Sequence, residues 1–208
     1  DRPSPSPYTG PEVKDAETIE RMRVAGRIAA NAMAAAASVI APGVTTDEVD
    51  RFGHEYLLDH GAYPSTLGYK GFPKSLCTSV NHVVCHGIPG DRKLKSGDIV
   101  NIDVTVIKDG FHGDSSRMFC IGAPSIQARR LVDTAYAAMW KGIRAVRPGA
   151  RLGDIGQAIQ EFTERHHYSV VREFCGHGIG RQFHEEPQVL HYGRAGTGAL
   201  LEPGMIFT

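Results

Sequence analysis

The chain has 208 residues, 41% of them hydrophobic, which is enough to form one sizeable core. Lysine plus arginine and aspartate plus glutamate number 23 each, so no net charge draws the chain to nucleic acid or to an anionic membrane. No apolar stretch approaches the roughly 20 residues that cross a bilayer. We therefore expect a cytoplasmic protein that binds neither membranes nor nucleic acid.

The N-terminal part of the chain changes character near residue 15. Residues 1–14 are rich in proline and serine and are expected to form an extension, whereas residues 15–208 are expected to form a single catalytic domain. The pattern from Asp15 to Ile40 predicts a helix that the pair Pro42-Gly43 ends. Thr45 and Glu48 have the spacing of a capping box.

A second helix is expected from this capping box to Gly61. Its predicted apolar stripe consists of Val49, Phe52, Tyr56 and Leu57. A further helical pair begins near Pro124 and is interrupted at Pro148-Gly149 before it resumes up to about His166. Two helix pairs of similar design therefore frame the central part of the chain.

Between the helix pairs, residues 99–107 alternate in a pattern typical of a strand. The predicted core side carries Val100, Ile102, Val104 and Val106. Asp103 then lies on the opposite side of the strand.

The dipeptide Asp109-Gly110 predicts a tight hairpin, because both central positions of a type I′ turn need positive φ. Pairing outward from this turn sets Thr105 opposite Asp114, which makes Asp114 a diagonal neighbour of Asp103 at roughly 7 Å or less between Cβ atoms. Two carboxylates this close repel each other unless a cation lies between them. The hairpin therefore indicates a divalent metal site; the alternative is a pair of solvated aspartates on an exposed sheet face.

The two halves of the chain repeat one another where turn chemistry is strict. Corresponding segments are Ala41–Val44 and Arg147–Ala150, Cys85–Ile88 and Gly176–Ile179, and Leu94–Val100 and Leu201–Phe207. At the spacing that separates Gly97 from Gly204, Asp103 corresponds to position 210, just beyond Thr208.

Five segments make the chain resemble the type I methionine aminopeptidases of bacterial kind. They are Asn81–Pro89, Asn101–Val104, His112–Ser115, Gly176–Gly180 and Phe183–Pro187. The resemblance implies an α/β (α+β) pita-bread fold with pseudo-two-fold symmetry, in which two helix pairs back a curved antiparallel sheet. It also implies that the domain is truncated before its C-terminal strands.

The resemblance places a dinuclear metal centre in the hollow of the sheet. Asp103, Asp114 and His177 match three of its five protein ligands; the other two, both glutamates, fall at position 210 and further downstream, outside the chain. The implied cofactors are two divalent ions (Co, Mn, Fe, Ni or Zn) that activate a water molecule. Asn81 and Val83 match a loop that binds one sodium or potassium ion.

The remaining site residues follow from the same resemblance. His86 matches the histidine that binds the peptide nitrogen beyond the cleaved bond, and His184 matches the one that stabilises the charged oxygen of the tetrahedral intermediate. The slot for the methionine side chain is expected from Tyr69, Phe72, Cys77 and Phe183. The four cysteines lack paired spacing, which indicates free thiols.

The expected function is removal of the initiator methionine from nascent polypeptide N-termini, by a monomer for which the ribosome is a candidate partner. Two alternatives stay open at this point. One is an Xaa-Pro-type peptidase of the same fold, which normally carries an extra N-terminal domain. The other is a metal-free pita-bread protein that works by surface recognition.

Overall fold

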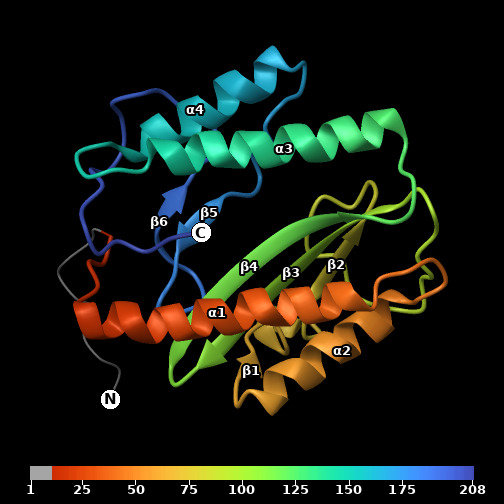
Figure 1. Ribbon diagram of the computed structural model, residues 1–208. Helices are drawn as coiled ribbons and strands as arrows, with labels where there is room; N and C mark the ends of the chain where they lie inside the picture. The colour runs from red at the N-terminus through yellow and green to blue at the C-terminus, as the bar shows by residue number, and fades with distance from the viewer. Residues whose placement is uncertain (1–10) are drawn as a thin grey trace. The chain divides into compact units, whose positions relative to one another are not determined.

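A computed structural model describes residues 11–208, which form two compact units (Figure 1). The first, called the sheet unit, comprises residues 17–133 and 180–183. The second, called the C-terminal unit, comprises residues 134–179 and 184–208 together with the described residues up to Ala16. The two carboxylates of the predicted metal site belong to the sheet unit.

Two helices of the sheet unit match their sequence predictions. Helix α1 (Ala16–Ser38) is followed by helix α2 (Thr46–Asp59). The capping box is formed: Glu48 N donates to Thr45 Oγ1 over 3.1 Å, and Thr45 N donates to Glu48 Oε2 over 2.7 Å. These two bonds satisfy backbone donors that the first turn of a helix otherwise leaves unpaired.

The sheet of this unit is antiparallel and built around one long strand. Its members are β1 (Tyr63–Pro64), β2 (Cys77–Val80), β3 (Ile99–Lys108) and β4 (Phe111–Cys120). Strand β3 pairs with β4 along its whole length and with β1 and β2 at different points of its other edge. A short 3-10 turn, η1 (Tyr69–Gly71), lies in the connection from β1 to β2.

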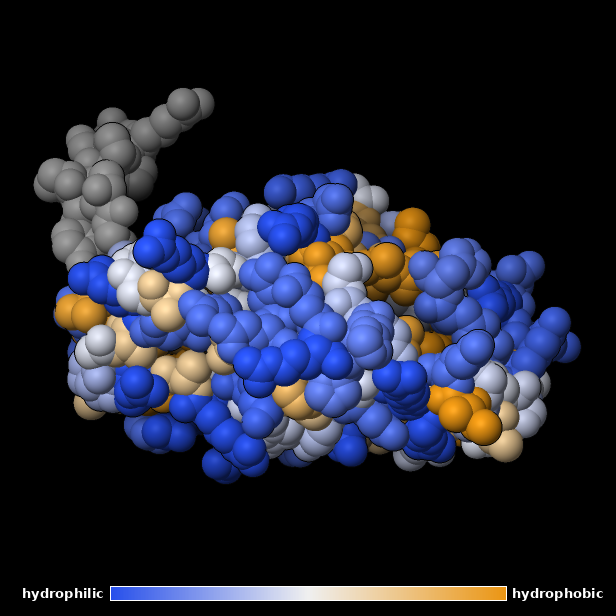
Figure 2. Space-filling model, turned by 90° about the horizontal axis from the view of Figure 1, so that it is seen from above, coloured by the Kyte–Doolittle hydropathy of each residue, from blue (hydrophilic) through white to orange (hydrophobic). Residues whose placement is uncertain are grey.

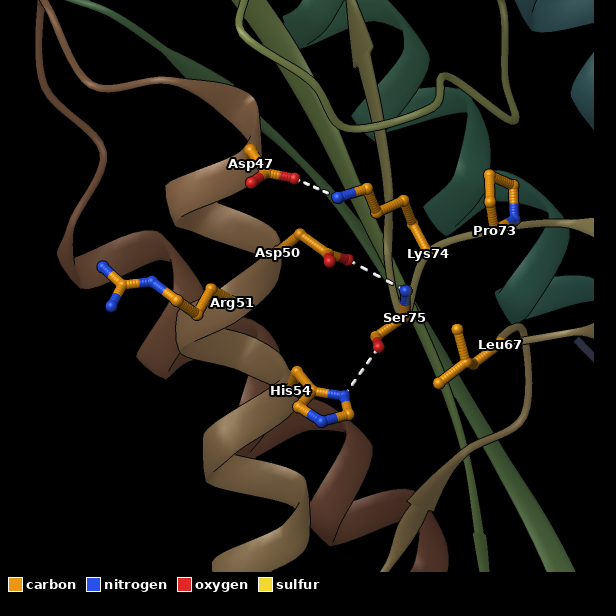
Figure 3. A pocket seen from close by; sticks show the side chains of 8 residues that line it. All are labelled: Asp47, Asp50, Arg51, His54, Leu67, Pro73, Lys74 and Ser75. Atoms are coloured by element: carbon orange, nitrogen blue, oxygen red, sulfur yellow. Dashed lines mark hydrogen bonds and ion pairs between the residues drawn. The ribbon is translucent and has the colours of Figure 1, made fainter.

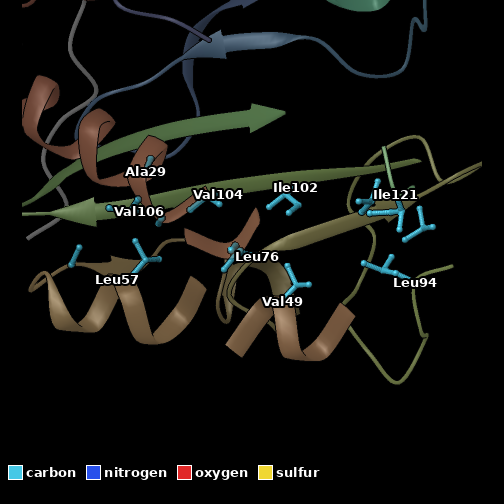
Figure 4. Packing of buried hydrophobic residues seen from close by; sticks show 14 residues of the cluster. Ala29, Val49, Leu57, Leu76, Leu94, Ile102, Val104, Val106 and Ile121 are labelled. Carbon is cyan, nitrogen blue, oxygen red and sulfur yellow. The ribbon is translucent and has the colours of Figure 1, made fainter. Parts of the chain in front are cut away.

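The core of the sheet unit lies between the helices and the sheet (Figure 4). The four predicted core positions of β3 are all at most 1% exposed. Helix α1 contributes a stripe of small side chains, among them Ala25, Ala29 and Ala32, each 0% exposed. A β-carbon at Gly113 of β4 would lie 2.4 Å from the backbone of Ala25, so this strand position needs glycine for the close approach of α1.

One member of the predicted stripe of α2 is wrong. Val49 and Leu57 are buried, but Phe52 is 42% exposed. The inward face of α2 is turned so that Gly53 meets Leu76, whose Cδ2 lies 2.6 Å from where a β-carbon at position 53 would be. The large side chain at position 52 therefore points away from the core.

The C-terminal unit contains two helices and a two-stranded sheet. Its elements are α3 (Ile126–Ala145), which belongs to this unit from Thr134 on, α4 (Leu152–Arg165), β5 (Gly176–Gly178) and β6 (Glu185–Val189). Helices α3 and α4 approach closely at Gly142, where a β-carbon would lie 2.7 Å from Ile159 Cδ1. A small apolar core consists of Ala150, Ile155, Val189 and Leu201.

The repeat predicted from the sequence is present in the backbone of the two units. Gly43 and Gly149, which follow the corresponding prolines, both have positive φ, 96° and 85°. Gly43 N donates to Leu94 O over 2.7 Å, and Gly149 N donates to Leu201 O over 3.2 Å. Each helix pair is therefore joined by a Pro-Gly turn. In each case the glycine donates a hydrogen bond to the corresponding leucine downstream, Leu94 or Leu201.

The predicted N-terminal extension is partly integrated into the C-terminal unit. Residues 1–10 lie outside the described residues, but Val13 bridges to Met205 and Lys14 N donates to Gly204 O over 2.8 Å. The Lys14 side chain is 2% exposed, and its Nζ lies 2.7 Å from Glu185 Oε2. The last residues before α1 thus hold the start of β6.

The face in Figure 2 is mostly hydrophilic, with small hydrophobic areas between the polar residues. Several large apolar side chains of α3 are among the exposed ones, including Tyr136 at 54% and Trp140 at 40%. Within residues 11–208, no helix is both long and apolar enough to cross a bilayer.

Candidate active site

The two aspartates of the hairpin lie as the sequence predicts. Asp109 and Gly110 have φ of 50° and 83°, and the register sets Thr105 opposite Asp114 and Asp103 opposite Ser116. Asp103 and Asp114 are therefore diagonal neighbours on one face of the sheet, and both are partly buried. The hairpin turn alone fixes this arrangement, because a slip of one residue would move Asp114 to the opposite face.

Cys77 begins β2 directly opposite Asp103 on the other edge of β3. The thiol is 3% exposed. Burial raises the pKa of Cys77 to about 12, and the negative charges of Asp103 and of other neighbours, including Asp114, contribute to the same shift. The thiol therefore stays neutral at physiological pH, and it presents a soft, uncharged sulfur beside the two carboxylates.

The aromatic residues predicted to line the methionine slot meet within the sheet unit. The rings of Tyr69 and Phe183 lie 4.8 Å apart between centroids, although 113 residues separate them in the chain. Phe183 also stacks on His112 at 5.7 Å, and His112 Nδ1 lies 2.7 Å from Ser65 Oγ. Phe72 follows η1 as its C-terminal cap residue.

His112 was not predicted as a site residue. Its signal was available, since it belongs to the motif segment that contains Asp114 and takes part in the β3–β4 hairpin opposite Ile107. Its backbone N donates to Gly180 O over 2.8 Å, which ties the segment carrying Phe183 to β4. Sequence reasoning missed it because a histidine on a strand gives no periodic signal of its own.

His177 and His184 meet within the C-terminal unit, with ring centroids 4.2 Å apart. His177 Nδ1 lies 2.8 Å from Gly178 O. A carbonyl oxygen can only accept, so Nδ1 carries the proton and Nε2 carries the lone pair. This is the tautomer that a metal ligand needs when it coordinates through Nε2.

The two glycines beside His177 lie against backbone atoms of other segments. A β-carbon at Gly176 would lie 2.1 Å from Thr208 O, and one at Gly178 would lie 2.1 Å from Glu186 O. Both glycines therefore leave room for the backbone of neighbouring segments, and these close contacts hold the strand that carries His177 in place.

The loop with His86 is attached to β2. His86 is exposed and has a φ of 56°. Thr78 N donates to Gly87 O over 2.8 Å, and a β-carbon at Gly87 would lie 2.2 Å from Thr78 O. Backbone contacts thus hold the His86 turn against the strand that begins with Cys77.

The predicted monovalent-cation residues lie at the end of β2. Asn81 has a φ of 55°, its Nδ2 donates to Asp98 Oδ1 over 2.8 Å, and its Oδ1 accepts from Ile99 N over 3.0 Å. Val83 N donates to Val80 O over 3.2 Å. The Asn81 side chain therefore closes the connection between β2 and β3.

The metal ligands predicted from the family are divided between the two units: Asp103 and Asp114 belong to the sheet unit and His177 to the C-terminal unit. Among the described residues, no three His, Cys, Asp or Glu side chains form a cluster that could hold an ion. The donor types nevertheless fit divalent metals, since two carboxylates occupy one sheet face and His177 has the required tautomer.

A separate open pocket of about 330 Å³ lies beside α2 (Figure 3). It is lined by Asp47, Asp50, Arg51, His54, Leu67, Pro73, Lys74 and Ser75. Asp47 and Lys74 form an ion pair across it. None of the pocket residues is among the site residues predicted from the sequence, and His54 Nδ1 lies 2.7 Å from Ser75 Oγ.

Comparison with known proteins identifies the class. Residues 20–208 match metallopeptidase family M24, and the chain belongs to this family, whose members depend on divalent metal ions.

Within the family, the chain is similar to methionine aminopeptidases. The methionine aminopeptidase of Rickettsia prowazekii (strain Madrid E) is 56% identical over 188 residues, which are 90% of this chain and 73% of that protein. A crystal structure of methionine aminopeptidase from Rickettsia prowazekii matches with a TM-score of 0.93 and 53% identity, over 95% of this chain and 79% of that chain. These relatives confirm the expected family, pita-bread fold and enzyme class, a metal-dependent aminopeptidase.

The Xaa-Pro alternative has weaker support. Prolidase from Pyrococcus furiosus matches with a TM-score of 0.78 over 94% of this chain and 56% of that chain, but at 23% identity. A likeness at this level shows a common fold alone.

Proposed function

We propose that this enzyme removes the N-terminal methionine from nascent polypeptides and peptides. The observation that carries the proposal is the β3–β4 hairpin, whose register sets Asp103 and Asp114 as diagonal neighbours on one sheet face. The chain belongs to family M24 and is similar to methionine aminopeptidases, and its motif resemblance matches these two carboxylates to ligand positions.

Asp103, Asp114 and His177 are proposed to supply three of the five protein ligands of two divalent ions. Carboxylate oxygens with one imidazole suit Mn, Fe, Co, Ni or Zn. When bound, such ions act as Lewis acids and lower the pKa of a water molecule so that it can attack a carbonyl at neutral pH. The hairpin contributes by holding its two carboxylates in place before any ion binds.

Two histidines are proposed to act on the peptide itself. His184 donates a hydrogen bond to the carbonyl oxygen as negative charge develops there, and its ring lies 4.2 Å from that of the proposed ligand His177. His86 binds the peptide nitrogen beyond the cleaved bond. Removing one such donor typically lowers kcat by about 10²–10³-fold.

The methionine side chain is proposed to bind between aromatic rings and a neutral sulfur. The Tyr69–Phe183 pair supplies an apolar surface, and thioethers interact favourably with ring edges. Phe72 and Cys77 complete the slot. A slot of this kind selects by shape and apolar contact, because nothing in the methionine side chain requires a charged partner.

Peptide or protein N-termini are the substrates of an enzyme of this class. Beyond this, we propose a cytoplasmic monomer that meets its substrates as they leave the ribosome. We also propose that the loop with Asn81 and Val83 binds one sodium or potassium ion, in keeping with the left-handed backbone at Asn81.

The proposal is tested by methionine release from Met-Gly-Met with added Mn²⁺ or Co²⁺. Asp103→Asn and Asp114→Asn each remove one ligand charge, and we expect at least a roughly 100-fold loss of kcat/KM together with weaker ion binding in calorimetry. Asp109→Asn is the matched control. It removes a carboxylate from the same hairpin at a 70% exposed position, and asparagine tolerates positive φ there.

We expect Asp109→Asn to retain wild-type release and ion binding. Equal release by the wild type and both ligand variants would refute Asp103 and Asp114 as metal ligands. A wild type that neither binds ions nor releases methionine would favour the metal-free binding protein.

A further inference from the structure

One face of helix α2 contacts the short segment that leads into β2. Asp50, Gly53 and His54 follow the i, i+3, i+4 spacing that places side chains on one side of a helix. Asp50 Oδ1 accepts a hydrogen bond from Ser75 N over 3.0 Å, which Figure 3 shows. The same oxygen accepts a second hydrogen bond from Leu76 N over 2.7 Å. The missing side chain at Gly53 makes room for Leu76.

Ser75 is held at each of its polar atoms. Its N donates to Asp50, its Oγ lies 2.7 Å from His54 Nδ1, and its carbonyl oxygen accepts a hydrogen bond from Thr66 Oγ1. Ser75 is 3% exposed and Asp50 is 7% exposed. Four hydrogen bonds, three of them buried and the one to His54 partly buried, thus converge on two consecutive residues, Ser75 and Leu76.

This clamped segment lies between the proposed walls of the methionine slot. Tyr69 and Phe72 precede Ser75 in the same connection, and Cys77 follows Leu76 as the first residue of β2. Since Cys77 is registered opposite Asp103, a shift at Ser75 would move the thiol relative to both the aromatic rings and the carboxylates. The hydrogen bonds to Ser75 and Leu76 therefore fix the backbone that carries Phe72 on one side and Cys77 on the other.

Stability alone does not explain a buried carboxylate, because removing its charge from water costs free energy. Burial raises the pKa of Asp50 even though the Leu76 and Ser75 amides act to lower it. Apolar side chains of similar size often stabilise a buried position as well or better. The pocket beside these contacts, about 330 Å³ in volume, also leaves room for the segment to move once the hydrogen bonds are removed.

We propose that Asp50 and His54 are positioning residues that set the width of the methionine slot by fixing Ser75. This inference rests on the proposed function, which assigns Tyr69, Phe72 and Cys77 to the slot. Neither α2 residue touches the substrate. Their effect passes through the Ser75–Leu76 backbone to the side chains on either side of it.

The first test needs no activity. Metal-free wild type, Asp50→Ala, Asp50→Asn and Val49→Ala are treated with iodoacetamide, and mass spectrometry follows each cysteine separately. We expect Cys77 to react about tenfold faster in Asp50→Ala, because local opening becomes easier. Asp50→Asn keeps an acceptor oxygen for the two amides and should restore slow labelling.

Val49→Ala is the matched control, because it creates a cavity on the same helix at a 1% exposed position without removing any of the hydrogen bonds to Ser75 and Leu76. It should lower the melting temperature without selective labelling of Cys77. Cys175, which is partly exposed and belongs to the C-terminal unit, is the reference thiol for labelling outside the sheet unit.

The second test compares Met-Gly-Met with Leu-Gly-Met as substrates. For Asp50→Ala we expect a higher KM for the methionine peptide, a nearly unchanged kcat, and about a tenfold loss of selectivity for methionine over leucine. Asp50→Asn should recover the selectivity, and Val49→Ala should not lose it.

The outcomes separate this inference from the proposed function. If Asp50→Ala leaves both Cys77 labelling and selectivity unchanged, or accelerates all four cysteines equally, the positioning role is overturned. A wild type that binds ions but releases no methionine contradicts the proposed function, whereas the labelling pattern decides by itself whether Asp50 holds Cys77.

Discussion

Gly113→Ala is expected to destabilise the protein severely for a change of one methyl group. The added carbon would lie 2.4 Å from Ala25 C, 2.5 Å from Ala25 O and 2.5 Å from Gly26 N. All three are backbone atoms of α1, so no side-chain rotation relieves the contact. The helix and the strand must separate instead.

The magnitude follows from the required displacement. Ordinary carbon contacts begin near 3.4 Å, so the gap must open by about 1 Å at a point where the neighbouring core is closely packed. Overpacking of this kind costs about 1–3 kcal/mol, and immobile backbone on one side favours the upper end. A loss of about 3 kcal/mol corresponds to a fall in Tm of roughly 6–12 °C for a chain of this size.

The assay is urea unfolding followed by circular dichroism, with Gly26→Ala as the control. Position 26 lies on the same helix, and a β-carbon there meets nothing within 4 Å. We expect Gly26→Ala to raise the free energy of unfolding by up to about 1 kcal/mol, since alanine favours the helix. Because Asp114 follows Gly113 directly, the strand variant should also bind Mn²⁺ more weakly.

Equal stability of Gly113→Ala and the wild type would refute the close approach of α1 to β4. Destabilisation without any change in ion binding would show that the hairpin keeps its carboxylates in place independently of α1.

Three further predictions concern local features of the fold. Thr45→Ala removes the side-chain acceptor for Glu48 N and should cost about 1 kcal/mol in urea unfolding, whereas Thr45→Ser should cost little; equal losses would contradict the capping box. Burial lowers the pKa of His191 from 6.5, so the unfolded chain takes up a proton before the folded protein as pH falls below this value, and the free energy of unfolding should decrease. His191→Gln should flatten this dependence between about pH 7.5 and 5.5, and an unchanged slope would argue against it. Lys14→Ala removes a buried ammonium group from the partly buried Glu185 carboxylate and should cost about 1–3 kcal/mol, so an unchanged Tm would show that the pair contributes nothing.

Much of the local structure was predictable because short-range chemistry decides it. The alternating pattern predicts β3, and the Asp109-Gly110 turn fixes its register with β4 down to the pairing of Thr105 with Asp114. The two Pro-Gly turns and the capping box have equally local causes. The prediction that Phe52 faces the core was wrong, because helical periodicity identifies an apolar stripe but does not fix which of its residues face the core.

The candidate site was predictable only in part. Motif resemblance indicated Asp103, Asp114 and His177, but no pattern pointed to the contact of Asp50 with Ser75 or to the stacking of His112 on Phe183. These contacts join residues far apart in the chain. Their partners depend on which surfaces meet when the helices dock on the sheet.

The sequence by itself determined the elements, the turns, the duplicated plan and the family of this protein, because each depends on dihedral preferences and spacings of a few residues. Tertiary structure decided what each polar group contacts: the neutral thiol of Cys77 opposite Asp103, the proton on His177 Nδ1, and the backbone that fills the space beside Gly176. Burial and hydrogen-bond partners exist only after distant segments have packed, and they set the chemical state of the site.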